Sequence, residues 1–184
     1  MRATVNVIIH SAWRVDFKLT LPSFEPQIKA TKNLIDFAWE SEYSGSTRFL
    51  FISSVASVQS WDKALGAVPE AIVEDLSVAA GRGYGESKYV AEQVRHVVFV
   101  FVLILSWQIV GKSGLPSSSL RVGQLTGGFP NGAWASTEWF PILVKSSLAI
   151  GALPAFSGVN NISWIHTVLI LETGCFMDPN ARCR

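Results

Sequence analysis

Short apolar segments alternate with segments of helical period, and this order restricts the fold more than any other feature of the sequence. Residues 5–10 and 48–54 are short, apolar and bounded by polar residues, which is typical of buried strands, and residues 118–125 form a third candidate strand. Helical spacing of apolar residues predicts helices near 20–42 and 83–96. The order strand, helix, strand, helix, strand predicts an α/β fold with a parallel sheet.

Composition excludes several classes of protein. The chain has 184 residues, 49% of them hydrophobic and 16% charged, with a net charge of +1. This favours one globular domain with a sizeable core and gives no indication of a nucleic-acid partner. The cysteines, Cys175 and Cys183, form no CxxC pair and have no nearby histidine, so no metal site is expected. The first residues do not resemble a signal peptide, and we expect a cytoplasmic protein.

A strongly apolar stretch, residues 97–110, fits the pattern badly. Its sequence is VVFVFVLILSWQIV, fourteen residues, whereas a membrane-spanning helix needs about 20. Three interpretations remain open: a membrane segment, which the length disfavours; a buried strand or an extension of the preceding helix; or a segment foreign to the fold. After Ile165 the sequence shows no clear structural element.

A tyrosine four residues before a lysine, Tyr84 and Lys88, is the pattern with the clearest chemical meaning. On one helix both side chains lie on the same face. The ammonium group can lower the phenol pKa, ordinarily about 10, and make the phenol a proton donor near neutral pH. A serine at the end of the neighbouring strand can bind the same carbonyl oxygen, while the hydride must come from a cofactor. The alternative is a half-buried tyrosine and a solvated lysine on an ordinary helix.

Several segments together resemble the extended short-chain dehydrogenase/reductase superfamily. They are similar in particular to the thioester reductase domains of fungal adenylate-forming, nonribosomal-peptide-synthetase-like reductases, which are related to carboxylic acid reductases and male-sterility reductases. The segments are VIIHSAWRVDF, SFEPQIKATKNLIDFA, FLFISSVAS, GYGESKYVAEQV, GLPSSSLRVGQLTGG and EWFPILVKSSLAIGALP, which cover most of residues 5–165. The resemblance implies a Rossmann-like, doubly wound parallel sheet, with residues 1–184 forming part of an NAD(P)-binding reductase domain.

The resemblance also implies a role for each matched residue. Tyr84 would be the proton donor, and Lys88 would hold the nicotinamide ribose and lower the tyrosine pKa. Ser54 would polarise the carbonyl, with Ser53 as the less favoured choice. The residues implied to bind the cofactor are Ser53, Tyr84 and Lys88, the turn of His10, Ser11, Ala12 and Trp13, and the segment Val122, Gly123 and Gln124. The residues implied to lie on the substrate side are Glu138, Trp139 and Lys145. The alternative is that these residues belong to a packed helix without ligand contact.

The family resemblance further implies NADPH as the hydride donor and a carrier-protein-bound acyl thioester as the substrate, which is released as an aldehyde. Family members begin with a strand, a GxxGxxG phosphate loop and a helix. The match here starts about three strands later, and residues 81–85, GRGYG, belong to the tyrosine helix. We therefore expect a sheet that is truncated at its N-terminus, lacks the phosphate-binding loop and is incomplete at its C-terminus.

These departures leave three functional hypotheses: an active reductase, a partial reductase domain that is inactive as this isolated chain, and a non-catalytic interaction or membrane-associated remnant. The second is favoured for this chain. Residues 95–111 replace what is only a short link in relatives, so we interpret them as an atypical apolar insertion, such as a translated intron, and not as a membrane anchor.

Overall fold

The computed structural model describes residues 5–43, 46–106, 115–128, 130–154 and 164–165, with side chains omitted from 95 to 106. The chain divides into two compact units, Met1–Val122 and Gly123–Arg184. Each unit is described separately below.

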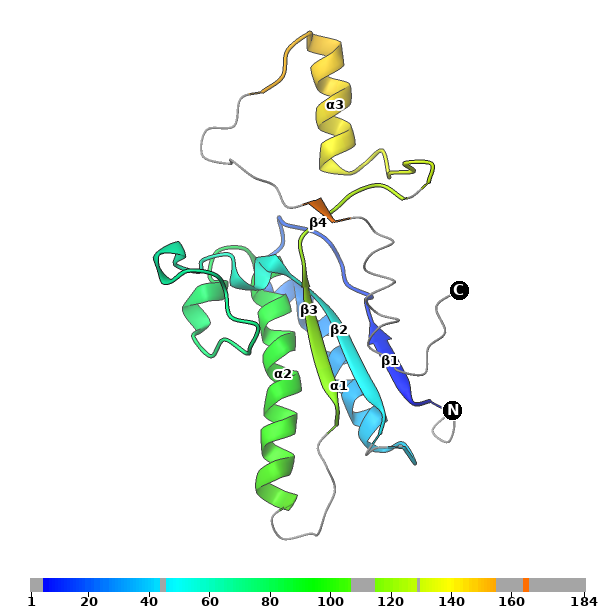
Figure 1. Cartoon of the computed structure of the whole chain (residues 1–184), viewed down its shortest axis with the longest axis vertical. Coiled ribbons are helices and arrows are strands. Elements are labelled where there is room, and N and C mark those ends of the chain that lie inside the picture. Colours follow the sequence, from blue (N-terminus) through cyan, green and yellow to red (C-terminus); the bar gives the residue numbers. More distant parts are fainter. Residues whose placement is uncertain (1–4, 44–45, 107–114, 129, 155–163, 166–184) are drawn as a thin grey trace. The chain divides into compact units, whose positions relative to one another are not determined.

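The first unit contains a parallel sheet in the order β1-β2-β3. Its strands are β1 (Val7–His10), β2 (Arg48–Ser54) and β3 (Ser117–Val122). Figure 1 shows β2 between the other two strands, and both pairings are parallel. The α/β fold with a parallel sheet that the sequence predicted is therefore confirmed.

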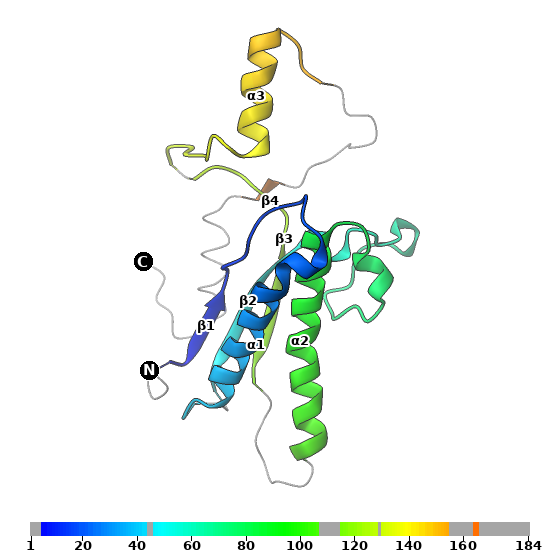
Figure 2. The same ribbon diagram turned by 180° about the vertical axis from the view of Figure 1, so that it is seen from behind.

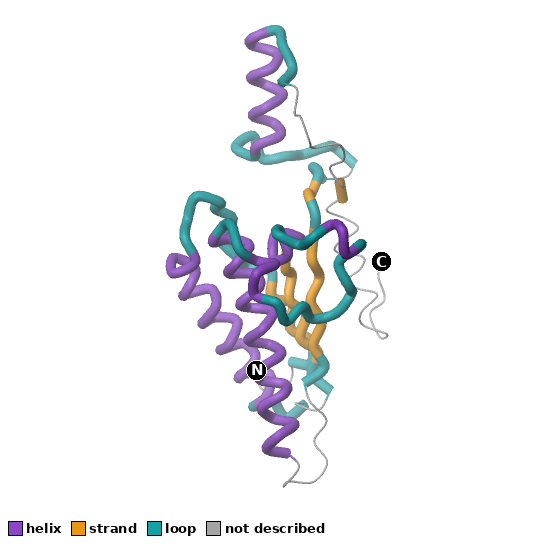
Figure 3. Tube along the Cα trace, turned by 90° about the vertical axis from the view of Figure 1, so that its left-hand side faces the viewer, coloured by secondary structure: helices purple, strands orange, loops and turns teal. Residues whose placement is uncertain are grey.

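Two helices connect these strands. The 3-10 turn η1 (Leu21–Phe24) leads into α1 (Glu25–Trp39) between β1 and β2, and α2 (Gly83–Ser106) lies between β2 and β3. Both connections step across the sheet in the same direction, so right-handed crossovers place both helices on the same face. Figures 2 and 3 show α1 and α2 together on that face. A doubly wound sheet, with helices on both faces, stays a prediction.

The first helix follows the predicted period closely. Pro26 lies in its first turn, where a missing N–H removes no helical hydrogen bond. Its buried residues are Thr31, Ile35 and Ala38, spaced four and three apart, so they form one stripe facing the sheet. The predicted helix near 20–42 is thus divided into η1 and a shorter α1.

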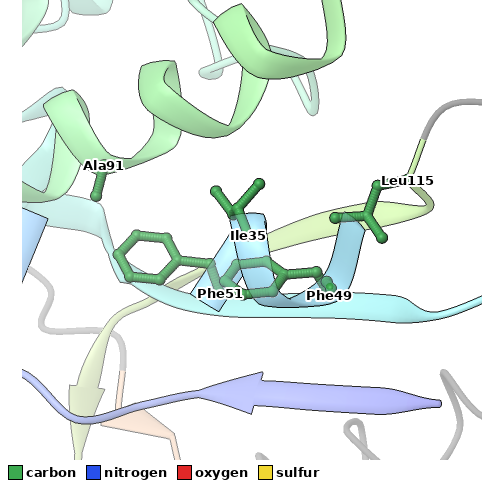
Figure 4. Packing of buried hydrophobic residues seen from close by; sticks show 6 residues of the cluster. Ile35, Phe49, Phe51, Ala91 and Leu115 are labelled. Atoms are coloured by element: carbon green, nitrogen blue, oxygen red, sulfur yellow. The ribbon is translucent and has the colours of Figure 1, made fainter. Parts of the chain in front are cut away.

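A hydrophobic cluster fills the space between the helices and the sheet. Its buried members are Ile35, Ala38, Phe49, Phe51, Ala91 and Leu115. Figure 4 shows the two phenylalanine rings of β2 beside Ile35, with Ala91 on α2. The small side chain of Ala91 allows α2 to approach β2 closely, and this contact fixes the start of α2 near the end of that strand.

The second helix continues well beyond its predicted end near residue 96. It extends through Ser106, so residues 97–106 continue the helix, as in one of the interpretations above. The run of valine, phenylalanine, leucine and isoleucine contains no glycine or proline to stop it. Residues 107–111 lie outside the described residues. Among the described residues, no helix combines the length and the apolar character needed to cross a membrane.

A long connection between β2 and α2 contains three 3-10 turns, η2 (Val55–Val58), η3 (Lys63–Leu65) and η4 (Leu76–Ala79). The last of these turns, η4, begins at Leu76. The Asp75 carboxylate accepts a hydrogen bond from the Ser77 backbone N–H and starts this turn.

The second unit contains a small parallel pair, β4 (Gln124–Leu125) with β5 (Trp164–Ile165), and the helix α3 (Trp139–Ile150). The prediction of one strand over residues 118–125 is therefore wrong, because these residues are divided between two sheets. Gly123 lies at the division, and it has no side chain to pack on either sheet.

Candidate functional site

The three residues predicted to act in catalysis meet at the carboxyl end of β2. Ser54 is the last residue of β2, and Tyr84 is the second residue of α2. Their hydroxyl groups are joined by a hydrogen bond. Lys88 lies one turn further along α2 and donates a hydrogen bond from Nζ to the Ile52 carbonyl oxygen at 2.7 Å. Ligands of parallel α/β sheets bind at this end of the strands.

Two glycines allow the start of α2 to lie against the backbone of η2 and of the segment that leads into η1. A Cβ atom on Gly85 would lie 2.2 Å from the Ala56 carbonyl oxygen, and one on Gly83 would lie 2.5 Å from the Leu19 carbonyl oxygen. Both contacts are with backbone atoms, which cannot rotate away. The glycines on either side of Tyr84 thus have a packing role that the sequence reasoning missed, although GYG was visible in the sequence.

The environment of Tyr84 keeps its phenol protonated. Only 8% of the residue is exposed, and the rings of Phe17 and Phe24 contact it edge-on, with the Phe17 centroid at 4.9 Å. Burial raises the pKa of Tyr84, while the hydrogen bond with Ser54 lowers it to a smaller extent. Burial thus outweighs the hydrogen bond, and a lowering of this pKa by Lys88 stays a prediction.

Lys88 is held as a buried cation with 3% of its surface exposed. Its Nζ lies 4.4 Å from the ring centroid of Trp13 and 4.8 Å from that of Phe51, which are distances of cation–π contact. Burial lowers the pKa of Lys88 to about 8, and the negative charge of Glu92 opposes this effect. The ammonium group is therefore held by these contacts, and its pKa is about 8.

The turn after β1 covers this lysine. Trp13 Nε1 donates a hydrogen bond to Ser87 Oγ at 3.2 Å, and Ser87 Oγ donates to the Tyr84 carbonyl oxygen at 2.7 Å. Ser11 and Ala12, two of the residues implied to bind a cofactor, are exposed in the same turn. The structure thus brings this turn to the start of α2.

The two serines at the end of β2 have different partners. Ser53 is buried and donates its hydroxyl hydrogen to Glu92 Oε1. Ser54 Oγ accepts a hydrogen bond from the Ala56 N–H at 3.2 Å and also bonds with Tyr84. Ser53 is thus engaged by Glu92, and the choice of Ser54 over Ser53 as the polarising hydroxyl stays a prediction.

The remaining predicted residues divide between the units. Val122 ends β3 opposite Ser54 in the sheet register. Gln124 accepts a hydrogen bond from Trp139 Nε1 at 2.9 Å inside the second unit. The structure does not relate the residues of the second unit to Tyr84, and their roles stay predictions. These residues are Gly123, Gln124, Glu138, Trp139 and Lys145.

No metal centre is visible in the described part of the chain, where no group of three histidine, cysteine, aspartate or glutamate residues could hold an ion. Cys175 and Cys183 lie outside that part. What the described site offers is two hydroxyl groups that can bind one carbonyl oxygen, next to a fixed cation. Hydroxyl donors aimed at one point stabilise the negative charge that develops on a carbonyl oxygen under attack.

A sequence profile of the family described as male sterility protein matches residues 1–168. An adenylate-forming reductase of Serpula lacrymans var. lacrymans is 52% identical over 166 residues, covering 90% of this chain. A carboxylic acid reductase of Neurospora crassa is 36% identical over 162 residues, covering 87% of this chain. The chain spans 14% of the length of each of these relatives.

The fold also has a match among solved structures. The terminal R domain of the myxalamid biosynthetic pathway matches with a TM-score of 0.72 at 22% identity, covering 95% of this chain and 40% of that one. The chain therefore belongs to the male sterility protein family of NAD-binding domains, with a fold like that of short-chain dehydrogenases, and is homologous to the reductase domains of fungal adenylate-forming reductases.

Proposed function

We propose that this chain carries the catalytic part of an NADPH-dependent thioester reductase domain whose substrate is a carrier-protein-bound acyl thioester. The observation that carries the proposal is the hydrogen bond between Ser54 and Tyr84 beside the buried Lys88, at the carboxyl end of parallel strands. The names of the adenylate-forming and carboxylic acid relatives support the reaction class.

In this mechanism the chain acts on the carbonyl oxygen of the thioester. Ser54 and Tyr84 donate hydrogen bonds to that oxygen and draw electron density toward it. The cofactor would supply the hydride that the carbonyl carbon receives, since no side chain can do so. Tyr84, protonated because of its burial, is suited to give its proton to the oxygen when the negative charge forms. The hydroxyl proton of the resulting hemithioacetal then returns to the Tyr84 phenolate while the carbon–sulfur bond breaks, so the carbonyl re-forms as the aldehyde and the thiolate leaves.

The residues around Lys88 fit a nucleotide cofactor in part. An ammonium group has three donors, and the bond to the Ile52 oxygen uses one of them. Hydroxyl groups of a ribose are suitable acceptors for the others. Ser11 and Ala12 are exposed in the adjacent turn, and together with Trp13 they would lie along the cofactor. Val122, Gly123 and Gln124 would lie near the nicotinamide.

Reduction of an acyl-pantetheine thioester tests the proposal, with this chain completed by the remaining segments of a relative's reductase domain, because the isolated chain is expected to be inactive. The readout is the loss of NADPH absorbance together with detection of the aldehyde. Tyr84→Phe and Ser54→Ala are expected to lower kcat by about 10²–10⁴-fold, the range of general acid–base effects. Tyr43→Phe, at an exposed tyrosine, and Ser118→Ala, at an exposed serine, are the matched controls. Full turnover by Tyr84→Phe would contradict the assignment.

Because the chain spans 14% of each relative reported above, turnover by this chain alone is a separate question. We propose that the isolated chain is inactive and that the same residues act when the rest of such a domain is present. The alternative is a non-catalytic interaction or membrane-associated remnant. When the rest of such a domain is present, loss of tryptophan fluorescence on addition of NADPH, reduced in Trp13→Phe, would favour the reductase over this alternative.

A further inference from the structure

A buried carboxylate lies one helical turn beyond Lys88. Glu92 is on the same helix, α2, and only 2% of the residue is exposed. A carboxylate is almost never buried to this degree unless charged or polar partners compensate for its lost hydration. The mechanism proposed above assigns no role to Glu92.

Three other elements provide the partners. Arg121 of β3 donates from Nη2 to Glu92 Oε2 at 2.8 Å and from Nε to the same oxygen at 3.2 Å. Ser57 of η2 donates to Glu92 Oε1 at 3.0 Å, and Ser53 of β2 donates to that oxygen too. One carboxylate therefore joins α2 to β2, η2 and β3.

Three of the joined elements, β2, η2 and α2, carry or adjoin a proposed catalytic group. Ser53 immediately precedes Ser54, and Ser57 belongs to the turn that Ser54 caps by accepting from the Ala56 N–H. Lys88 is four residues before Glu92, on the same face of α2. A change in the contacts of the Glu92 carboxylate would thus move both Ser54 and Lys88.

We propose that Glu92 is a positioning residue, which anchors the corner between β2 and η2 to α2 and so holds the Ser54 hydroxyl and the Lys88 ammonium in register. The catalytic meaning of this role rests on the proposed function. The anchoring itself is a property of the fold, and it can be measured without turnover.

The charges around Lys88 give the first measurement. Burial lowers the pKa of Lys88 and the charge of Glu92 raises it, while the pKa of His10 on β1 is lowered first by burial and then by the charge of Lys88. The Tyr84 ring also faces the ammonium group. Replacing the Glu92 carboxylate by a neutral amide is therefore expected to shift the Lys88 titration to lower pH. The charged group facing Glu92 from β3 is Arg121.

The titration can be followed by NMR of lysine labelled at the side chain, with the Lys88 signal assigned from Lys88→Met. Glu92→Gln keeps the size of the side chain and removes its charge. Glu86→Gln makes the same change on the same helix, where the Glu86 carboxylate contacts the Gly81 N–H instead. A downward shift in Glu92→Gln, absent in Glu86→Gln, is expected. An unchanged midpoint in Glu92→Gln would overturn the proposal.

A second variant covers the case in which Glu92→Gln does not fold. Ser57→Ala removes one hydrogen bond to Glu92 and leaves every charge in place. Because the Lys88 ammonium lies over the Trp13 ring, nearby Lys88 protons have ring-current-shifted NMR signals. Ser57→Ala is expected to reduce that shift, whereas Ser60→Ala, which removes only a bond to the Ala80 oxygen, should not.

The outcomes separate this role from a merely structural one. A loss of thermal stability in Ser57→Ala, with the Lys88 signals at their wild-type positions, would overturn the positioning role. If Tyr84→Phe keeps full turnover while the Lys88 signals respond as expected, the proposed function fails and the anchoring by Glu92 stands. Neither measurement requires a bound cofactor.

Discussion

The Lys88 ammonium lies 4.4 Å from the centre of the Trp13 ring. This contact joins the turn after β1 to the helix that follows β2, two segments that are distant in sequence. It encloses the positive charge between an aromatic face and the Ile52 carbonyl oxygen. The loss of hydration on burial disfavours the charged form, the charge of Glu92 opposes this effect, and the resulting pKa of Lys88 is about 8.

Lys88 should make stability depend on pH. The folded-state pKa is about 8, below its usual 10.5, so the unfolded chain binds more protons between these values. The contribution of Lys88 to the free energy of unfolding therefore rises with pH across that window. Below the window, the full cost of burying the charged ammonium group lowers stability. Relative to Lys88→Met, the wild type should gain stability from about pH 7 to about pH 10, measured by urea unfolding. Lys63→Met, at an exposed lysine, is the control. If the difference in unfolding free energy between the wild type and Lys88→Met stays constant with pH, the prediction is contradicted.

A methyl group at Gly85 should separate α2 from η2. The added Cβ would lie 2.2 Å from the Ala56 carbonyl oxygen, so the backbone must move. We expect Gly85→Ala to cost about 1–3 kcal/mol of unfolding free energy, as overpacking does, and to weaken the bond between Ser54 and Tyr84. Gly128→Ala, where the nearest atom lies at 3.7 Å, is the control. Equal thermal stability of the two variants would show that the close contact has no such effect.

The isolated chain is expected to bind NADPH weakly. Residues 1–184 contain no GxxGxxG segment, and such a segment gives the pyrophosphate its backbone N–H donors. Isothermal titration is the measurement, and micromolar binding would refute the prediction. Fusion of a phosphate-loop segment from a relative should restore affinity if the Lys88 side of the site is intact.

Deletion of residues 95–111 tests whether they are foreign to the fold. The core members Ala91 and Leu115 lie outside this range, so the cluster beneath α2 is retained. We expect the deletion variant to give more soluble protein than the full chain. Transcripts that keep these codons in most molecules would argue against a translated intron.

The local elements could be predicted from sequence because their signals are local. Alternating periods predicted β1, β2, α1 and the start of α2, and the spacing of Tyr84 and Lys88 predicted their common face. The end of α2 was wrong because its apolar sequence has no stop signal. The raised pKa of Tyr84 could not be predicted, because its burial beside Phe17 and Phe24 depends on the tertiary fold.

The hydrogen-bond network around Glu92 could not be predicted, because it too depends on the tertiary fold. Ser53 and Arg121 are aligned only once β2 and β3 pair in their parallel register. Their sequence separation is large, and neither belongs to a short motif. The one available signal was the position of Glu92, four residues after Lys88, and it does not identify the partners.

The alignment of Ser53 with Arg121 has a consequence for folding. A slip of one residue between β2 and β3 would turn Arg121 to the opposite face of the sheet. Glu92 would then be buried without its cation, and breaking a buried pair in this way costs about 3–5 kcal/mol. We infer that the ion pair discriminates against mispaired sheets. Replacing both partners by apolar residues should therefore yield more misfolded protein on refolding, even if the native state remains stable.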